Sequence, residues 1–121
     1  MILVHGGGDY VDNILQTIKK MLGIQNEYDV FDQDILVHIN TAFSVLNQLN
    51  IGPEDGLYVD ADTTWDMYID ETNLTMIKTY VYLKVKLIFD PPSSSVIVDS
   101  INRTLSELEF RLYVEGDSRD Q

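Results

Sequence analysis

The stretch KLIFDPPSSSVIVDS, residues 86–100, decides how the C-terminal half of this chain folds. The apolar run that enters it surrounds nearly the whole circumference of a predicted helix, and a second amphipathic pattern begins after it. Pro91 disfavours helical dihedral angles at Asp90, and the serines that follow can cap a new helix. Asp90, Pro91 and Pro92 therefore predict a structural corner, at which two helices fold back on each other.

Hydrophobic periodicity predicts four helices in the whole chain. These are a helix capped by Asp9 and ended by Gly23, a helix capped by Asp32 and stopped by Gly52-Pro53, a helix from about Asp70 to Phe89, and a helix from Ser94 or Ser95 whose apolar stripe is Ile97, Ile101, Leu105, Leu108 and Leu112. The third helix is apolar all round, which is typical of a helix that lies centrally in a bundle or is covered by neighbouring subunits. The predicted fold class is all-α, a small bundle of four helices.

The connection between the second and third helices is unusually long. Residues 53–69 show no sustained period, and such a segment in a compact domain is usually functional or disordered. Because Tyr58, Trp65 and Tyr68 make disorder less plausible, we expect a long ordered loop or arm here. The expected domain organisation is a flexible N-terminal lead at 1–8, a single helical domain at 9–114 and a polar C-terminal tail at 115–121.

Composition limits the classes of partner. The chain has 121 residues, and 20 acidic against 8 basic residues give a formal charge of −12, which argues against binding nucleic acid through its phosphates. The charge fits a protein with basic partners, a subunit of an acidic assembly, or a mimic of DNA. The chain has no cysteine, hence no disulfide framework or thiolate nucleophile, and no apolar run approaches a membrane span.

Two motifs resemble functional sites without their necessary context. His5-Gly6-Gly7-Gly8 resembles the oxyanion-hole loop of esterases, but the chain lacks the G-x-S-x-G nucleophile elbow. His38 falls at the edge of a predicted apolar stripe, where a core or exposed histidine is the simplest interpretation. We therefore expect no enzyme, no catalytic residue and no cofactor.

An acidic segment has the spacing of a calcium loop. Oxygen-bearing side chains occupy its first, third, fifth, seventh and twelfth positions, namely Asp60, Asp62, Thr64, Asp66 and Glu71. Its sixth position requires a left-handed turn, but the residue there is Trp65 instead of glycine, and no helix is predicted to enter the segment. We expect no metal site, and a calcium-responsive helical module stays open as a third alternative.

Aromatic residues outside the apolar stripes indicate a further buried surface. The candidate interface residues are Tyr58, Trp65, Tyr68, Tyr82, Phe110 and Tyr113. Single exposed aromatic residues are common, but several on helices that already have a full apolar face indicate more burial than four helices need. Oligomerisation is therefore expected.

The order of several segments carries a family resemblance. LNQLNIGP at 46–53, an acidic loop with a tryptophan, KTYVYLKVKLIFDPP at 78–92 and ELEFRL at 107–112 resemble, in order and spacing, the head–tail connector (adaptor) family of tailed bacteriophages. The resemblance extends from about Asp12 to Val114, and the residues before it depart from the usual start of the family.

The resemblance implies a structural virion protein in the neck, at the head–tail interface, assembled in the cytoplasm of the bacterial host. It implies a homo-oligomeric ring, twelve-fold in the family, that lies beneath the portal protein, extends the DNA channel and docks the stopper or tail-completion protein. Genomic DNA would pass through without sequence-specific binding, and no membrane would take part. The alternative function is an acidic DNA-mimic inhibitor that binds a basic nucleic-acid-handling protein.

Overall fold

The protein is built from helices. The computed structural model describes residues 13–67 and 73–119. Within these ranges the elements are α2 (Ile14–Leu22), α3 (Asp32–Gln48), the short 3₁₀ helix η1 (Trp65–Met67), α4 (Leu74–Phe89) and α5 (Ser95–Arg119). They include no strand, and a single isolated bridge joins Asn13 to Thr64. The prediction of an all-α fold with four helices is confirmed.

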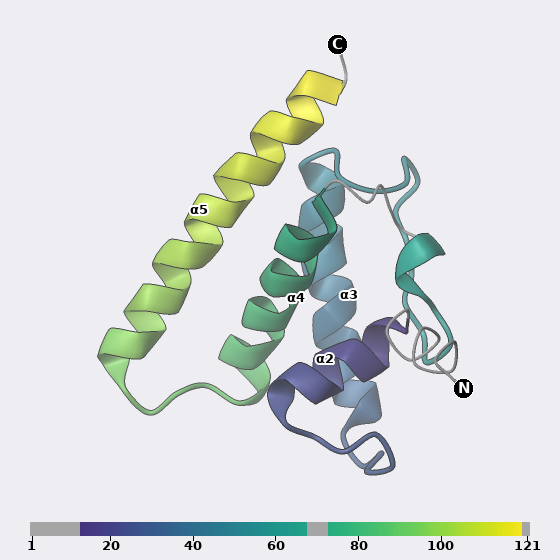
Figure 1. The fold of residues 1–121 in the computed structure, drawn as a ribbon, viewed down its shortest axis with the longest axis vertical. Helices are drawn as coiled ribbons and strands as arrows, with labels where there is room; N and C mark the ends of the chain where they lie inside the picture. Colours follow the sequence, from purple (N-terminus) through teal and green to yellow (C-terminus); the bar gives the residue numbers. More distant parts are fainter. Residues whose placement is uncertain (1–12, 68–72, 120–121) are drawn as a thin grey trace, which may run out of the picture.

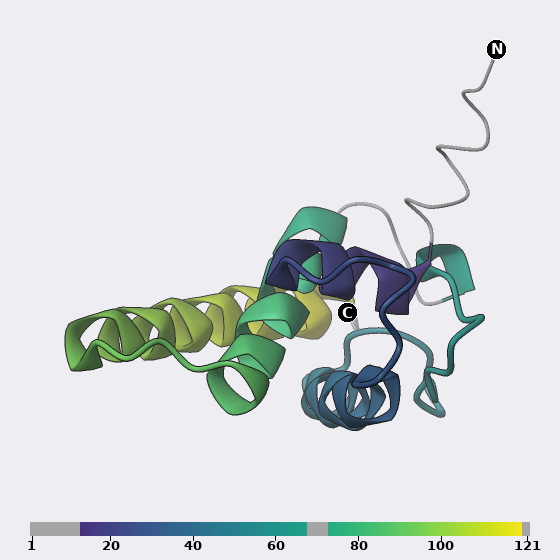
Figure 2. The same ribbon diagram turned by 90° about the horizontal axis from the view of Figure 1, so that it is seen from below.

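The helix α4 is the centre of the arrangement. It packs along α3 on one side, α2 crosses against both of them, and α5 lies on the opposite side of α4 (Figures 1 and 2). Fully or nearly fully buried residues come from all four helices and from the connection between α3 and α4: Ile14, Leu15, Ile18, Ile35, Leu36, Ile39, Ala42, Phe43, Leu46, Ile51, Val59, Trp65, Ile77, Tyr80, Val81, Val85, Leu105 and Leu112. The all-round apolar character of α4 is therefore explained by packing partners on two sides.

The first predicted helix boundary needs correction. Asn13, in an extended conformation, is the N-cap of α2, and its side-chain oxygen accepts a hydrogen bond from the Gln16 backbone N–H. The cap that was expected at Asp9 lies outside the described residues, and α2 begins only at Ile14. Its predicted end is confirmed, because Gly23 adopts a left-handed conformation with φ 83°.

The second predicted helix also begins differently, and the start of the third is not described. Asp32 is the first residue of α3 and not its cap; the N-cap position belongs to Phe31, which makes no side-chain cap hydrogen bond. The helix ends at Gln48, and left-handed residues follow it at Asn50 and Gly52. The described part of α4 begins at Leu74, whereas the start expected near Asp70 lies outside the described residues.

The predicted corner is present. Asp90 leaves helical geometry with φ −148° and ψ 64°, and the Ser94 hydroxyl accepts a 3.4 Å hydrogen bond from the Ile97 backbone N–H at the start of α5. The Lys86 ammonium also forms an ion pair with Asp90 Oδ2 at 3.0 Å. The chain therefore turns between α4 and α5, as Pro91 requires.

The helix α5 differs from its prediction at both ends. Of its expected stripe, Leu105 and Leu112 are buried, but Ile97 is exposed. Figure 1 shows the reason: the corner sets the start of α5 apart from α4, and the two helices approach each other only further along. Residues 115–119, expected as part of a polar tail, continue the helix to Arg119.

The connection between α3 and α4 includes residues 68–72, which the structure does not describe. The prediction of one ordered loop through the whole connection therefore stays a prediction. Its described part, residues 49–67, passes beside α3 and contains η1 (Figure 1).

Candidate functional site

One amide side chain attaches the connection to α3. Asn40 Nδ2 donates hydrogen bonds to the carbonyl oxygens of Val59 and Leu36, both at 2.9 Å, and its Oδ1 accepts the Val59 N–H at 2.7 Å. These bonds satisfy both backbone groups of Val59, whose side chain is buried. The connection is thus fixed on α3 at this residue.

The acidic segment after Val59 uses its first carboxylate within its own turn. Asp60 Oδ1 accepts hydrogen bonds from the Asp62 N–H at 2.9 Å and the Thr63 hydroxyl at 3.0 Å. The Asp62 N–H, followed by the Thr63 hydroxyl, lowers the pKa of Asp60 below its ordinary value. Residues 13–67 and 73–119 hold no group of three or more potential metal ligands. Glu71, the twelfth position of the calcium spacing, lies outside them.

Trp65 has a role inside the subunit. Its side chain is only 2% exposed, and its indole N–H donates to the Thr17 hydroxyl at 3.0 Å. Its ring contacts the Phe43 ring at 6.0 Å between centroids, and the Lys78 ammonium lies 5.4 Å from its centroid. As a candidate interface residue Trp65 needs correction, because its side chain packs in the core and anchors η1 to α2, α3 and α4.

The other candidate interface residues lie on separate elements. Tyr58 is 79% exposed on the connection, and Tyr82 on α4 is half-buried against the core. Phe110 and Tyr113 are exposed on α5, where a spacing of three residues puts them on the same face of the helix. Tyr68 lies outside the described residues. Phe110 and Tyr113, with the exposed Val114, form an apolar strip on α5.

A polar contact attaches α5 to α4. The hydroxyl of the fully buried Tyr80 donates to Glu109 Oε2 at 2.7 Å, and the Lys84 ammonium lies 3.9 Å from the same oxygen. Burial, followed by the hydrogen bond to Glu109, raises the pKa of the Tyr80 hydroxyl far above its ordinary 10.0. The buried Leu105 and Leu112 supply the apolar part of the same attachment.

We expect Tyr80→Phe to lower the free energy of unfolding by about 1–3 kcal/mol near neutral pH, because Glu109 loses a donor. Since the folded state keeps Tyr80 neutral to a higher pH than the unfolded chain does, its contribution is complete below pH 10 and is lost as pH rises above it. The variant should therefore lose less stability than the wild type above pH 10. Urea titrations at several pH values measure this, and parallel pH curves for the two proteins would contradict it.

The end of the bundle carries an aromatic group that sequence reasoning missed. Tyr28 and Phe31 contact each other with ring centroids 5.9 Å apart, and Phe31 contacts Phe89 at 5.3 Å. These three residues are called the aromatic end. The available sequence signal was two aromatic residues in a short interhelical loop, followed along the chain by Phe89 at the edge of the proline corner.

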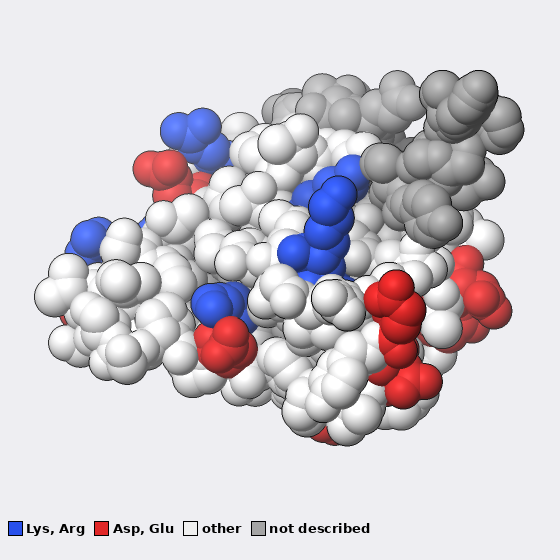
Figure 3. All heavy atoms as spheres, turned by 60° about the horizontal axis from the view of Figure 1, so that its bottom comes forward, with Lys and Arg blue, Asp and Glu red and all other residues white. Residues whose placement is uncertain are grey.

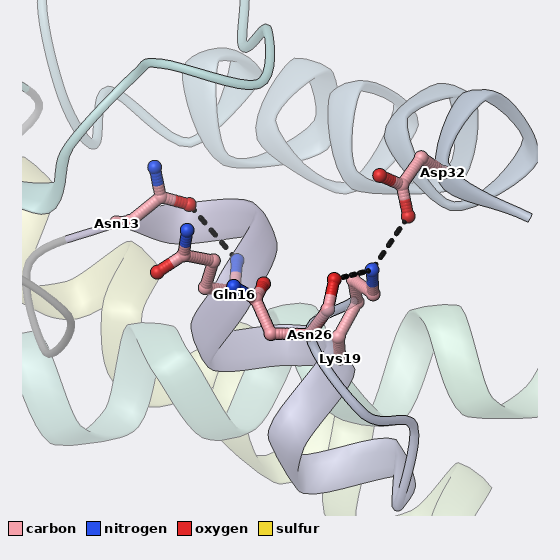
Figure 4. Close-up of polar contacts among 5 residues, drawn as sticks. All are labelled: Asn13, Gln16, Lys19, Asn26 and Asp32. Atoms are coloured by element: carbon pink, nitrogen blue, oxygen red, sulfur yellow. Dashed lines mark hydrogen bonds and ion pairs between the residues drawn. The ribbon is translucent and has the colours of Figure 1, made fainter. Parts of the chain in front are cut away.

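A buried lysine holds the loop of the aromatic end in place (Figure 4). Lys19, 1% exposed, places its ammonium 2.8 Å from Asp32 Oδ1 and 2.9 Å from the Asn26 carbonyl oxygen, to which it donates a hydrogen bond. It therefore joins the end of α2, the loop after it and the first turn of α3. Such a buried cation requires partners of this kind.

Large apolar side chains are exposed on α5, on the connection and at the aromatic end. The chain belongs to the phage connector protein family, whose family model matches residues 14–119. It is therefore a structural component of the phage particle. Comparisons with curated proteins and with solved structures found no match. None of the described helices is long and apolar enough to cross a membrane.

Proposed function

We propose that this protein is the head–tail connector (adaptor) subunit that forms a ring beneath the portal, extends the DNA channel and docks the stopper or tail-completion protein. The observation that carries the proposal is the family match over residues 14–119, which includes every described helix. The ring would lie in the neck of the virion after assembly in the host cytoplasm.

The apolar strip of α5 is the best candidate for a contact between subunits. Phe110, Tyr113 and Val114 are exposed although α5 already buries Leu105 and Leu112 on its other side. Burying exposed apolar side chains of this kind against a neighbouring subunit stabilises the assembly, because it removes them from water. The connection between α3 and α4, with Tyr58 exposed on it, would act as an arm that contacts a second molecule.

The acidic charge suits a DNA channel. Acidic walls repel phosphates, so the DNA would slide without being held. The same charge of −12 makes subunits repel one another, and this repulsion reaches further at low salt. Free subunits should therefore form rings weakly at low salt, and the portal would promote assembly.

The charge also keeps one alternative open, an acidic DNA mimic that inhibits a basic nucleic-acid-handling protein. A mimic would remain monomeric or dimeric and would bind a nuclease, repressor or polymerase. It offers no explanation for the exposed apolar strip of α5.

Negative-stain electron microscopy of the purified protein, with and without the portal of the same phage, tests the proposal. We expect rings, more abundant with the portal, and far fewer rings for the Phe110→Ser/Tyr113→Ser variant. Circular dichroism controls for its fold. A protein that stays monomeric or dimeric under both conditions would overturn the proposed function.

A further inference from the structure

The aromatic end lies on the loop between α2 and α3 and at the end of α4, which Figure 1 draws at the bottom of the bundle. Tyr28 is 50% exposed and Phe31 38%, and Val30, which precedes Phe31, and Ile88, which precedes Phe89, are exposed as well. Phe89 joins this surface to the corner between α4 and α5. Figure 3 brings this end forward, and much of the surface toward the viewer is neither acidic nor basic. Contiguous exposed apolar surfaces mark interaction sites in many proteins.

The loop of the aromatic end is also attached to α2 and α3 by polar contacts. The Lys19 ammonium binds the loop through the Asn26 carbonyl oxygen and binds α3 through Asp32. Burying a lysine in an otherwise apolar core costs free energy unless its ammonium finds polar partners. Here those partners fix a loop whose outer side chains face solvent. A surface that is ordered before binding loses less entropy when a partner arrives. Lys19 thus holds the loop that carries Tyr28 and leads to Phe31.

The rim of this surface is acidic and unneutralised. Glu27, Asp29 and Asp34 are exposed, and in the part of the chain that the structure describes no ion pair joins any of them to a base. By contrast, Asp32 and Asp90 in the same region have Lys19 and Lys86 as partners. An apolar centre with unpaired carboxylates around it complements an apolar segment flanked by positive charge.

A second copy of this chain fits that description poorly. Most of its described basic side chains are already engaged: Lys19, Lys84, Lys86 and Arg111 in ion pairs, and Lys78 over the Trp65 ring. With −12 per copy, two acidic rims would also repel each other. The occupant should therefore be a different protein that brings its own lysines or arginines.

We propose that the aromatic end, with its rim of Glu27, Asp29 and Asp34, is the docking surface for an apolar segment flanked by basic residues on another protein of the phage neck. This inference rests on the proposed function and adds which end of the subunit meets that partner. The apolar strip of α5 then remains for contacts between copies, so ring formation and partner docking use different residues.

The test uses the full chain, immobilised at low density, and the portal and stopper of the same phage as separate soluble probes. The variants are Tyr28→Ser/Phe31→Ser for the apolar centre, Glu27→Lys/Asp29→Lys/Asp34→Lys for the rim, and Phe110→Ser/Tyr113→Ser as the control matched in residue type. All substituted side chains are exposed, so each variant should fold, and circular dichroism checks this. Interferometry gives Kd at low and high salt, and electron microscopy gives the ring content.

We expect the wild type to bind one of the two probes, and the Tyr28→Ser/Phe31→Ser variant to raise Kd at least about tenfold, as the loss of an aromatic hot spot does. The rim variant should raise Kd mainly at low salt, where charges are least screened. The control should keep Kd within about twofold, as expected of residues outside the contact, and lose rings.

Four outcomes would overturn the inference. Unchanged binding by the Tyr28→Ser/Phe31→Ser variant, or an equal loss in the control, would overturn it and leave the proposed function intact. If the wild type forms rings that bind neither probe, the proposed docking partner is wrong and the proposed ring is kept. A wild type that forms no rings and binds neither probe would overturn the proposed function together with the inference.

Discussion

Replacing Trp65 with alanine is expected to lower the free energy of unfolding by about 3–5 kcal/mol, the usual range for removing a large aromatic side chain from a packed core. The indole is 2% exposed, contacts the Phe43 ring and the Lys78 ammonium, and donates its N–H to the Thr17 hydroxyl. Alanine leaves a cavity where η1 meets three helices, and it removes the donor to Thr17. Urea unfolding followed by circular dichroism measures the loss.

Two variants make this prediction specific. Trp65→Phe keeps a ring in the site and should cost clearly less than alanine. Tyr58→Ala, on the same connection but 79% exposed, should change stability by no more than about 0.5 kcal/mol. If the alanine variants at Trp65 and Tyr58 unfold alike, the anchoring role of Trp65 is wrong.

Trp65 also shows what periodicity cannot predict. The helices were predictable because their buried residues recur with the helical period, as Ile35, Ile39 and Leu46 do in α3. A residue in a single 3₁₀ turn has no such signal, and the partner of Trp65, Thr17, is 48 positions away along the chain. Its burial therefore follows from tertiary packing, and sequence reasoning placed it among the candidate interface residues.

The corner shows the opposite case and its limit. Proline restrains local dihedral angles, so the break after Phe89 was predictable from Pro91 alone. How far apart the two helices lie after the break depends on the whole turn, and the exposed Ile97 reflects that separation. A stripe of apolar residues predicts a buried face only where a partner element reaches it.

Charged residues near helix ends show a further limit of local reasoning. Lys19 lies in the last turn of α2 and Asp32 in the first turn of α3, and each position suits the helix dipole. That local explanation was sufficient for each residue separately. The structure joins them instead in one ion pair, in which the lysine is buried and the carboxylate is partly exposed.

Replacing Lys19 with methionine is therefore expected to lower the free energy of unfolding by about 3 kcal/mol. Removing one partner of a buried ion pair leaves the other charge uncompensated, which typically costs about 3–5 kcal/mol. The lower part of that range applies because Asp32 is 25% exposed and water can solvate it in part. Methionine has nearly the shape of the lysine stem, so the loss reports on charge and hydrogen bonding more than on volume.

Lys20→Met is the matched control, since Lys20 is the next residue on α2 and is exposed. It should leave stability within about 0.5 kcal/mol of the wild type. Adding Asp32→Asn to Lys19→Met removes the stranded carboxylate, so the double variant should cost less than the two single changes summed, with a coupling of about 0.5–3 kcal/mol. Urea unfolding of the wild type, Lys19→Met, Asp32→Asn and the double variant completes the cycle. Hydrogen exchange at Asn26 to Phe31 should accelerate in Lys19→Met but not in Lys20→Met. Additive costs with unchanged exchange would mean that the loop is held by its backbone alone, and the aromatic end would then be positioned without its lysine.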